Sequence, residues 1–362
     1  MAEIKPFRAL RYDERKAGPL EDLVAPPYDV IGPEERESYL AKSPHNVVHL
    51  TLPESEAEAG RLFRDWREQK ILVLDEAGFW ALSQDYVGPD GVARTRTGLV
   101  GSLKVEPYET GTVLPHERTH RGPKEGRLRL LREVGAQLEP IFLLHEGERR
   151  PFDVPERAPD LDVEGTRLWR LDEAAAISEA FADRQLLIAD GHHRYETALA
   201  YHEEAGTPES GYMLVVLVSV DDPGLEIFPT HRVFGTRPAE TLGGEERSGP
   251  EDALAELNEL PRERAAVVVY GDGRTELALD GDGELDVRLV DRLGHEGLTY
   301  TPDWQAAVRA VDKGEAEVAV LMRPTRIEDV FAVAKRGETM PQKSTYFFPK
   351  LLSGLLFHPL EP

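Results

Sequence analysis

Residues 186–197 read LLIADGHHRYET. Four apolar residues in a row, Leu186–Ala189, predict a short buried strand. Asp190-Gly191 then predicts a turn, because glycine adopts backbone conformations that other residues avoid. A helix follows over residues 192–205, and the glycine and proline just beyond it are typical stop signals. The sequence therefore predicts a strand, a turn and a helix in direct succession.

The first turn of this helix carries three side chains that can be positive, His192, His193 and Arg194. The N–H groups at a helix start are unpaired, and the helix dipole favours a negative charge there by about 0.3 to 1 kcal/mol. Most helices place acidic residues at this point, so the reversed pattern indicates an anionic ligand. We expect residues 191–194 to bind phosphate, with Arg194 binding it bidentately. The alternative is that Asp190 only caps the helix while the histidines pack or face solvent.

The composition excludes several classes of function. Lys plus Arg number 43 and Asp plus Glu number 67, which gives a net charge of −24 in 362 residues. Such an acidic chain is not expected to bind nucleic acid or membranes. The chain has no cysteine, so thiol nucleophiles, disulfides and thiolate zinc sites are ruled out. Without an apolar leader or a long apolar run, we expect a cytoplasmic protein.

The pattern along the chain predicts an α/β protein with mixed (α+β) sheets, in two domains. The domains are expected at 1–235, which carries the phosphate-binding turn, and 236–362, because residues 235–250 lack periodicity. The C-terminal tail is expected to return to the site. Helices are expected at 55–70 and 172–182, buried strands at 140–144, 212–220 and 317–322, and hairpins within 71–105 and 265–279.

The segment His116–His120 formally matches the zinc-peptidase pattern of two histidines one helical turn apart beside a glutamate. That pattern needs a continuous helix, whereas Pro115 precedes the segment and Gly122-Pro123 follows it. A second interpretation joins His116 and Glu117 to Lys124 and Arg127 in a polar active-site loop. Glu117 would then orient or deprotonate an acceptor hydroxyl, and the two cations would bind phosphate oxygens. The third interpretation is a solvated charged loop.

Three further groups are candidates for the same site. His231 and Arg232 follow an apolar strand, where α/β proteins often bind ligands, although such a pair is frequently structural. Lys343, Ser344 and Thr345 suit a phosphate, but the glycines of a Walker motif do not precede them. Asp29, in the segment after two prolines, is a candidate ligand for Mg²⁺ or a base, or part of a plain turn.

Several of these motifs occur together, in this order, in one family. The chain resembles the bacterial and archaeal family known as domain of unknown function 1015 over nearly its whole length. The segments that carry the resemblance are Phe7-Arg8, Val24–Val30, His116-Glu117, Asp190–Arg194, Pro229–Arg232 and Met340–Phe347.

The Asp-Gly-His-His-Arg turn is also similar to the nucleotide-binding turn of the ParB/sulfiredoxin-like superfamily. This resemblance implies a ParB-like nucleotide-binding core in which Gly191, His192, His193 and Arg194 bind nucleotide phosphates. Sulfiredoxin activity needs a cysteine that the chain lacks, and the DNA-binding helices and basic surface of ParB are not evident. Small-molecule kinases such as free-serine kinases remain. The frequent location of family genes beside serine-biosynthesis genes points to serine or phosphoserine.

We therefore expect a phosphotransferase that acts between a nucleotide (ATP, ADP or CTP, with Mg²⁺) and a small hydroxylated metabolite. The expected catalytic residues are Asp190, Glu117, His116 and His193, with Asp190 or Glu117 as the base. A phosphatase would need nearly the same residues. Two other classes remain open, a metal-dependent hydrolase using His116, Glu117 and His120, and a nucleotide sensor that binds without catalysis.

Overall fold

The computed structural model describes residues 2–117, 121–147, 150–282 and 285–360. The chain divides into two compact units, a larger one of Met1–Gly88, Ala93–Leu225 and Pro349–Pro362, and a smaller one of Pro89–Val92 and Glu226–Phe348. The division after Leu225 falls ten residues before the boundary that the sequence suggested. The reason is that β13 (Glu226–Phe228) pairs with β20 (Tyr346–Phe348). The chain passes to the smaller unit through β13 and returns from it after β20, so both strands are counted with the smaller unit.

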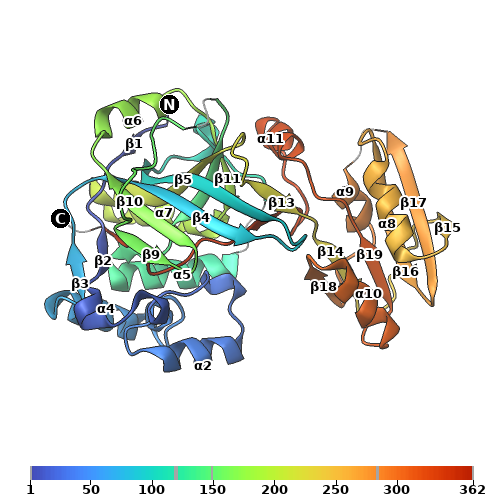
Figure 1. Cartoon of the computed structure of the whole chain (residues 1–362), viewed down its shortest axis with the longest axis horizontal. Coiled ribbons are helices and arrows are strands. Elements are labelled where there is room, and N and C mark those ends of the chain that lie inside the picture. The colour runs from blue at the N-terminus through green and yellow to red at the C-terminus, as the bar shows by residue number, and fades with distance from the viewer. Residues whose placement is uncertain (1, 118–120, 148–149, 283–284, 361–362) are drawn as a thin grey trace. The chain divides into compact units, whose positions relative to one another are not determined.

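A mixed sheet of nine strands, counted within the described residues, forms the centre of the larger unit (Figure 1). The order across the sheet is β6 (Val113–Leu114), β11 (Leu186–Asp190), β8 (Ile141–His145), β12 (Tyr212–Ser219), β5 (Ala93–Lys104), β4 (Phe79–Val87), β10 (Thr166–Leu171) and β9 (Leu161–Val163). The remaining strand, β1 (Ile4–Lys5), pairs with β5. The pairs β11–β6 and β12–β8 are parallel and the other pairs are antiparallel.

Both faces of this sheet are covered by apolar side chains. On one face, α6 (Ala174–Phe181) and α7 (His192–Ala205) contribute residues such as Phe181 and Tyr195 to the core formed with the strands. On the other face, Leu351 and Leu355 of the C-terminal segment lie against Leu168 and neighbouring strand residues. The C-terminal segment therefore belongs to the core of the larger unit.

Two further helices follow one another beside α7. Helix α5 (Arg121–Val134) packs against both α7 and α4 (Glu56–Glu68) (Figure 1). The Ser55 hydroxyl caps α4 by accepting a hydrogen bond from Glu58 N. The helix expected at 55–70 is present, and its apolar residues Phe63 and Trp66 are buried.

The smaller unit is built on a separate antiparallel sheet, in which α8 (Pro250–Glu259), α9 (Asp286–Asp291) and α10 (Trp304–Asp312) contact the strands. The hairpin predicted at 265–279 is present. The strand order is β15 (Gly244–Arg247), β17 (Arg274–Asp282), β16 (Arg264–Gly271), β19 (Val318–Leu321), β14 (His231–Phe234) and β18 (Leu298–Thr301).

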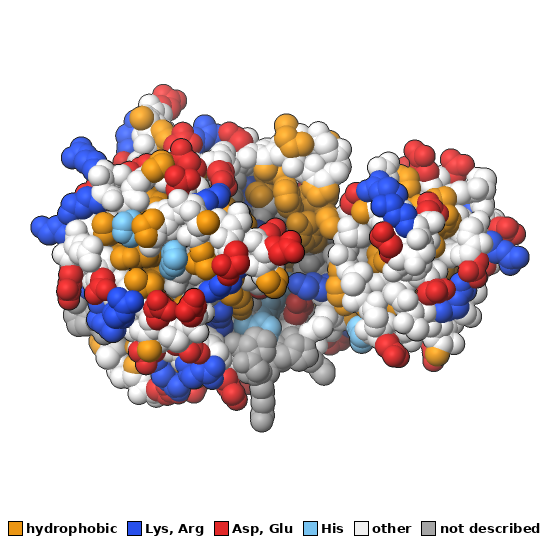
Figure 2. All heavy atoms as spheres, turned by 90° about the horizontal axis from the view of Figure 1, so that it is seen from below, with side chains coloured by type: hydrophobic (Ala, Val, Ile, Leu, Met, Phe, Trp, Pro, Cys, Tyr) orange, Lys and Arg blue, Asp and Glu red, His pale blue; other side chains and the backbone are white. Residues whose placement is uncertain are grey.

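The surface reflects the acidic composition. Figure 2 shows Asp and Glu side chains spread over the visible face of each unit, interspersed with Lys and Arg. Among the helices of the described residues, none combines the length and the apolar character needed to span a bilayer.

Candidate active site

The turn after β11 has the backbone conformation that only glycine adopts readily. Gly191 lies at φ +100°, and a Cβ atom on it would lie 2.6 Å from Cγ2 of Ile141. Helix α7 begins at the next residue and ends at Ala205, as the sequence predicted. Within the described residues no side chain caps its first turn. The turn therefore brings the backbone N–H groups of a helix start close to the end of the central sheet.

Asp190, at the end of β11, binds two cations. Its Oδ2 lies 2.8 Å from Nη2 of Arg194, and its Oδ1 lies 2.7 Å from Nζ of Lys350. The three side chains are 12 to 22 % exposed. Burial by itself raises the pKa of Asp190, but the adjacent Lys350 and Arg194 charges outweigh it and hold that pKa well below its ordinary value. Asp190 is therefore ionised at any physiological pH.

His192 is buried and neutral. Its Nε2 accepts a hydrogen bond of 3.2 Å from the backbone N–H of His116, so that nitrogen carries no proton. The ring of His116 lies edge-on to it at 4.7 Å and donates from Nδ1 to the carbonyl of Ile188 at 2.7 Å. Burial lowers the pKa of both imidazoles. The first turn therefore does not present three cations, which corrects the sequence interpretation, and Lys350 supplies the second positive group.

Lys350 was missed by the sequence analysis, because its only signal is its position just after the matched segment Met340–Phe347. The residues that follow it pack over the sheet, and Ser353 pairs with Ala25 through backbone hydrogen bonds. This pairing places the N-terminal segment beside Lys350. Asp29 acts electrostatically on both Lys350 and Arg194, so this predicted metal ligand lies near the cations.

Glu139 is a second residue that the sequence did not single out. Its Oε1 accepts hydrogen bonds from Tyr28 N at 3.0 Å and Ser353 Oγ at 2.8 Å, so it holds the N-terminal and C-terminal segments together. Arg194 also donates to the carbonyl of the next residue, Pro140. The site therefore draws on the β11–α7 turn, the start of β8 and both ends of the chain.

The predicted polar loop is brought only partly to this site. Glu117 Oε1 lies 3.9 Å from Nε2 of His116. Lys124 of α5 forms an ion pair of 3.1 Å with Glu196 of α7. Arg127 donates to the carbonyl of Thr51 and stacks over the ring of Tyr28 at 3.7 Å. Lys124 and Arg127 therefore each contact another group of the protein.

The zinc interpretation finds no support in the described geometry. Helix α5 begins at Arg121, beyond His116 and Glu117, so no helix presents these two residues as the zinc-peptidase pattern requires. His120 lies outside the described residues. No group of three His, Asp or Glu side chains within the described ranges is placed to bind a metal ion.

The remaining candidates are His231, Arg232 and the loop Lys343–Thr345. They belong to the smaller unit. His231 is buried and its Nδ1 accepts a hydrogen bond from Met322 N. Burial and the adjacent Arg232 lower the pKa of His231 to about 4. Arg232 donates to the carbonyls of Thr230 and Gln342.

The Lys343–Thr345 loop also makes local contacts. The hydroxyl of Ser344 donates to the carbonyl of Pro341, and its own carbonyl accepts from Thr325 Oγ1. Lys343 is exposed, and Thr345 is half-buried. The segment that returns to the larger unit begins at Pro349, after this loop.

The fold and the site together define a mixed α/β protein with a charged strand–turn–helix centre. The chain belongs to the family described as protein of unknown function (DUF1015), whose model matches residues 4–293. No curated protein matches the sequence.

Several solved structures are similar to this chain at a low level. A free serine kinase in complex with AMP has a TM-score of 0.40 at 19 % identity, covering 67 % of this chain and 89 % of that chain. A conserved hypothetical protein from Pyrococcus furiosus has a TM-score of 0.39 at 19 % identity, covering 67 % and 92 %. SbnI with a C-terminal truncation, from Staphylococcus aureus, has a TM-score of 0.40 at 15 % identity, covering 71 % and 87 %.

Proposed function

We propose that this protein transfers a phosphoryl group between a nucleotide and a small hydroxylated metabolite. The observation that carries the proposal is the cluster of Lys350, Asp190 and Arg194 at the start of α7. Both cations lie beside a helix start that itself favours anions. A phosphate group satisfies both features, and the resemblance of the turn to nucleotide-binding proteins supports the same ligand.

The charges suggest different roles for the carboxylates. A general base works best with a pKa near the working pH, and Asp190 lies far below that range. In our proposal Asp190 positions Lys350 and Arg194, and Glu117 takes the proton of the acceptor hydroxyl. That hydroxyl oxygen bonds to the terminal phosphorus of the nucleotide as the bond to the bridging oxygen breaks. The products are a phosphate ester and a nucleotide shortened by one phosphate.

Mg²⁺ fits this proposal through Asp29. Mg²⁺ usually binds one or two carboxylates together with water and substrate phosphates, rather than a complete protein cage. Asp29 offers one exposed carboxylate near the two cations. The ion would neutralise phosphate charge, and Asp29 would hold it against the nucleotide.

The test uses labelled ATP, ADP and CTP with candidate hydroxylated metabolites, serine first because of the resemblance of the turn. Wild type should transfer label, and Arg194→Ala and Lys350→Met should lose at least about tenfold in nucleotide affinity, since each removes a charged contact. The matched control is Lys313→Met, which removes an exposed lysine of the smaller unit. Transfer from a phosphorylated metabolite to water would favour the phosphatase. Stoichiometric binding without turnover would leave only the sensor.

A further inference from the structure

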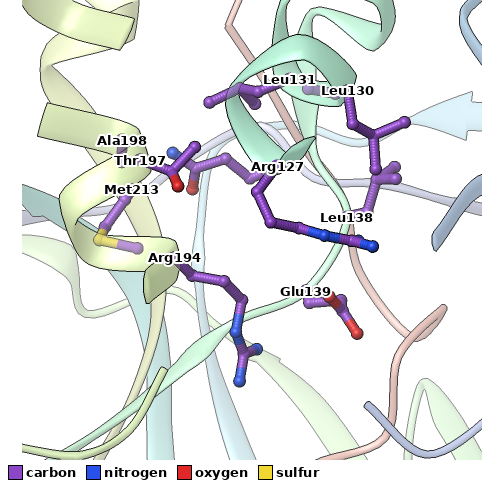
Figure 3. A pocket seen from close by; sticks show the side chains of 11 residues that line it. Arg127, Leu130, Leu131, Leu138, Glu139, Arg194, Thr197, Ala198 and Met213 are labelled. Atoms are coloured by element: carbon purple, nitrogen blue, oxygen red, sulfur yellow. The ribbon is translucent and has the colours of Figure 1, made fainter. Parts of the chain in front are cut away.

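Lys350 lies in a segment without regular secondary structure. Strand β20 ends at Phe348, and residues 349–352 belong to no helix or strand of the described chain. Arg194, the other cation of the site, extends from helix α7 (Figure 3), so the helix fixes its backbone. The position of Lys350 therefore depends on contacts between its segment and other parts of the fold.

One such contact comes from Arg96 of β5, whose side chain is completely buried. Its Nη2 donates a hydrogen bond of 2.7 Å to the carbonyl oxygen of Pro349. That oxygen belongs to the peptide group that joins Pro349 to Lys350, and a peptide group is planar. Arg96 therefore fixes the plane from which the backbone of Lys350 starts.

The guanidinium of Arg96 is itself held by the central sheet. Its Nε and Nη2 both donate to Oε1 of Gln84 on β4, and its Cζ lies 4.6 Å from the centre of the Phe142 ring on β8. Phe142 is the register partner of Asp190 in the β8–β11 pair. The same guanidinium thus contacts the strand next to Asp190 and the peptide group next to Lys350. These two residues form the 2.7 Å ion pair of the site.

Beyond Lys350, the segment is held again at Ser353. The backbone of Ser353 pairs with Ala25, and its hydroxyl donates to Oε1 of Glu139 at 2.8 Å. Lys350 therefore lies between two anchored points, the carbonyl of Pro349 and the backbone of Ser353. The first of these is directly adjacent to Lys350 and is held by a charged group in the interior of the sheet.

A buried guanidinium indicates a purpose beyond packing. Its removal from water costs free energy, and its hydrogen bonds offset that cost. An apolar side chain at position 96 would fill the same space without this cost, but it would not donate to the carbonyl of Pro349. The residue type therefore agrees with a role in holding the C-terminal segment.

We propose that Arg96 is a positioning residue, which holds Lys350 on Asp190 and so sets the affinity of these charges for phosphate. This inference rests on the proposed function and extends it to a residue outside the site. Because Arg96 is completely buried, it offers no surface to a ligand and acts only through its neighbours. It fixes the peptide group before Lys350, and Lys350 then meets both Asp190 and the phosphate.

The test is a double-mutant cycle between Arg96 and Lys350, measured as the Kd values of ATP, CTP and inorganic tripolyphosphate. Arg96→Lys keeps the charge but lacks the planar fork that binds Gln84 and Pro349 together. It should weaken binding about threefold, and Arg96→Met should weaken it about tenfold, because a charge-assisted hydrogen bond is lost. In the Lys350→Met background each change should alter the Kd values by less than about twofold, because the residue that transmits the effect is absent.

Arg167→Met is the matched control, because it removes a half-buried arginine of the same sheet that pairs with Asp85. It should leave the Kd values unchanged. Equal weakening by the Arg96 variants in the wild-type and Lys350→Met backgrounds would overturn the proposal, since Arg96 would then support the fold in general. If Arg96→Met does not fold, the cycle with Arg96→Lys decides by itself.

Urea unfolding without a ligand tests the same link independently of the proposed function. The unfolding midpoint of the double variant, Arg96→Lys with Lys350→Met, should fall by less than the sum of the falls in the two single variants. Additive falls would overturn the positioning role and leave the proposed function standing. Failure of wild type to bind any of the three ligands would overturn the proposed function, and with it the role of Arg96 in phosphate binding.

Discussion

Lys350 donates a hydrogen bond of 2.7 Å from Nζ to Oδ1 of Asp190, across 160 positions of the chain. Arg194 binds the other oxygen of the same carboxylate. Burial alone lowers the pKa of Lys350, but Asp190 outweighs this effect and raises that pKa above its ordinary value. Both cations therefore keep their charge. In our proposal these two cations, and not the imidazoles of His116 and His192, attract the phosphate.

Asp190→Asn should destabilise the protein by about 2 to 3 kcal/mol at pH 7, since it leaves two largely buried cations without their carboxylate. A carboxylate whose pKa is lowered in the folded state stabilises it above the unfolded value of about 3.9. The difference from wild type should therefore shrink as the pH falls below about 4. Urea unfolding at pH 7 and at pH 3 to 4 measures this.

The matched control is Asp65→Asn, which breaks an exposed pair of the same spacing, with Arg61, on α4. It should change the free energy of unfolding by only about 0.3 to 0.5 kcal/mol. Equal losses in the two variants would contradict the central role of Asp190.

Gly191→Ala should destabilise more than Gly206→Ala, although both glycines have positive φ, +100° and +64°. At Gly206 a Cβ has open space, so only the backbone penalty of about 1 kcal/mol applies. At Gly191 the Cβ would also press on Ile141, and the turn must shift. Thermal melts of both variants compare the penalties. An equal fall in Tm would show that contact with Ile141 does not matter.

In His192→Gln, the free energy of unfolding should depend less on pH in the acidic range than in wild type. Burial lowers the pKa of His192, so below about pH 6.5 the unfolded chain binds a proton that the folded chain does not, and stability falls with pH. Glutamine can accept the hydrogen bond from His116 N without titrating. The loss of stability between pH 7 and pH 5, measured by urea unfolding, should be smaller in the variant. Identical pH slopes would mean that His192 is not held neutral.

Asp29→Asn should raise the Mg²⁺ concentration needed for half-maximal transfer by about tenfold, because it removes the one carboxylate that we assign to the ion. Nucleotide binding without Mg²⁺ should be unchanged or slightly tighter, since a negative charge near the phosphates is lost. Glu34→Gln, an exposed acidic residue of α2 (Pro33–Lys42), is the control. An unchanged Mg²⁺ dependence would remove Asp29 from the proposal.

The sequence predicted helices, strands and turns correctly where hydrophobic periodicity, glycine positions and apolar runs all indicated the same element. The helix over His192–Ala205, the hairpin at 265–279 and the strand before Asp190 are present. The mixed α/β class and the membership in the family followed from the same motifs. Residues 235–250 lack periodicity, and we interpreted them as an interdomain boundary. Within this segment, Gly244–Arg247 forms strand β15 of the smaller unit.

Only the tertiary structure decided the charges of the site. Whether an imidazole is charged depends on its burial and its partners, and neither is visible in the letters HHR. The pairing of Ser353 with Ala25 accompanies the contact of Lys350 with Asp190 and the position of Asp29 near Lys350 and Arg194. No local pattern encodes a contact between segments so far apart in the chain. The sequence thus determined that a turn of this kind exists, and long-range packing determined which residues give it its charge.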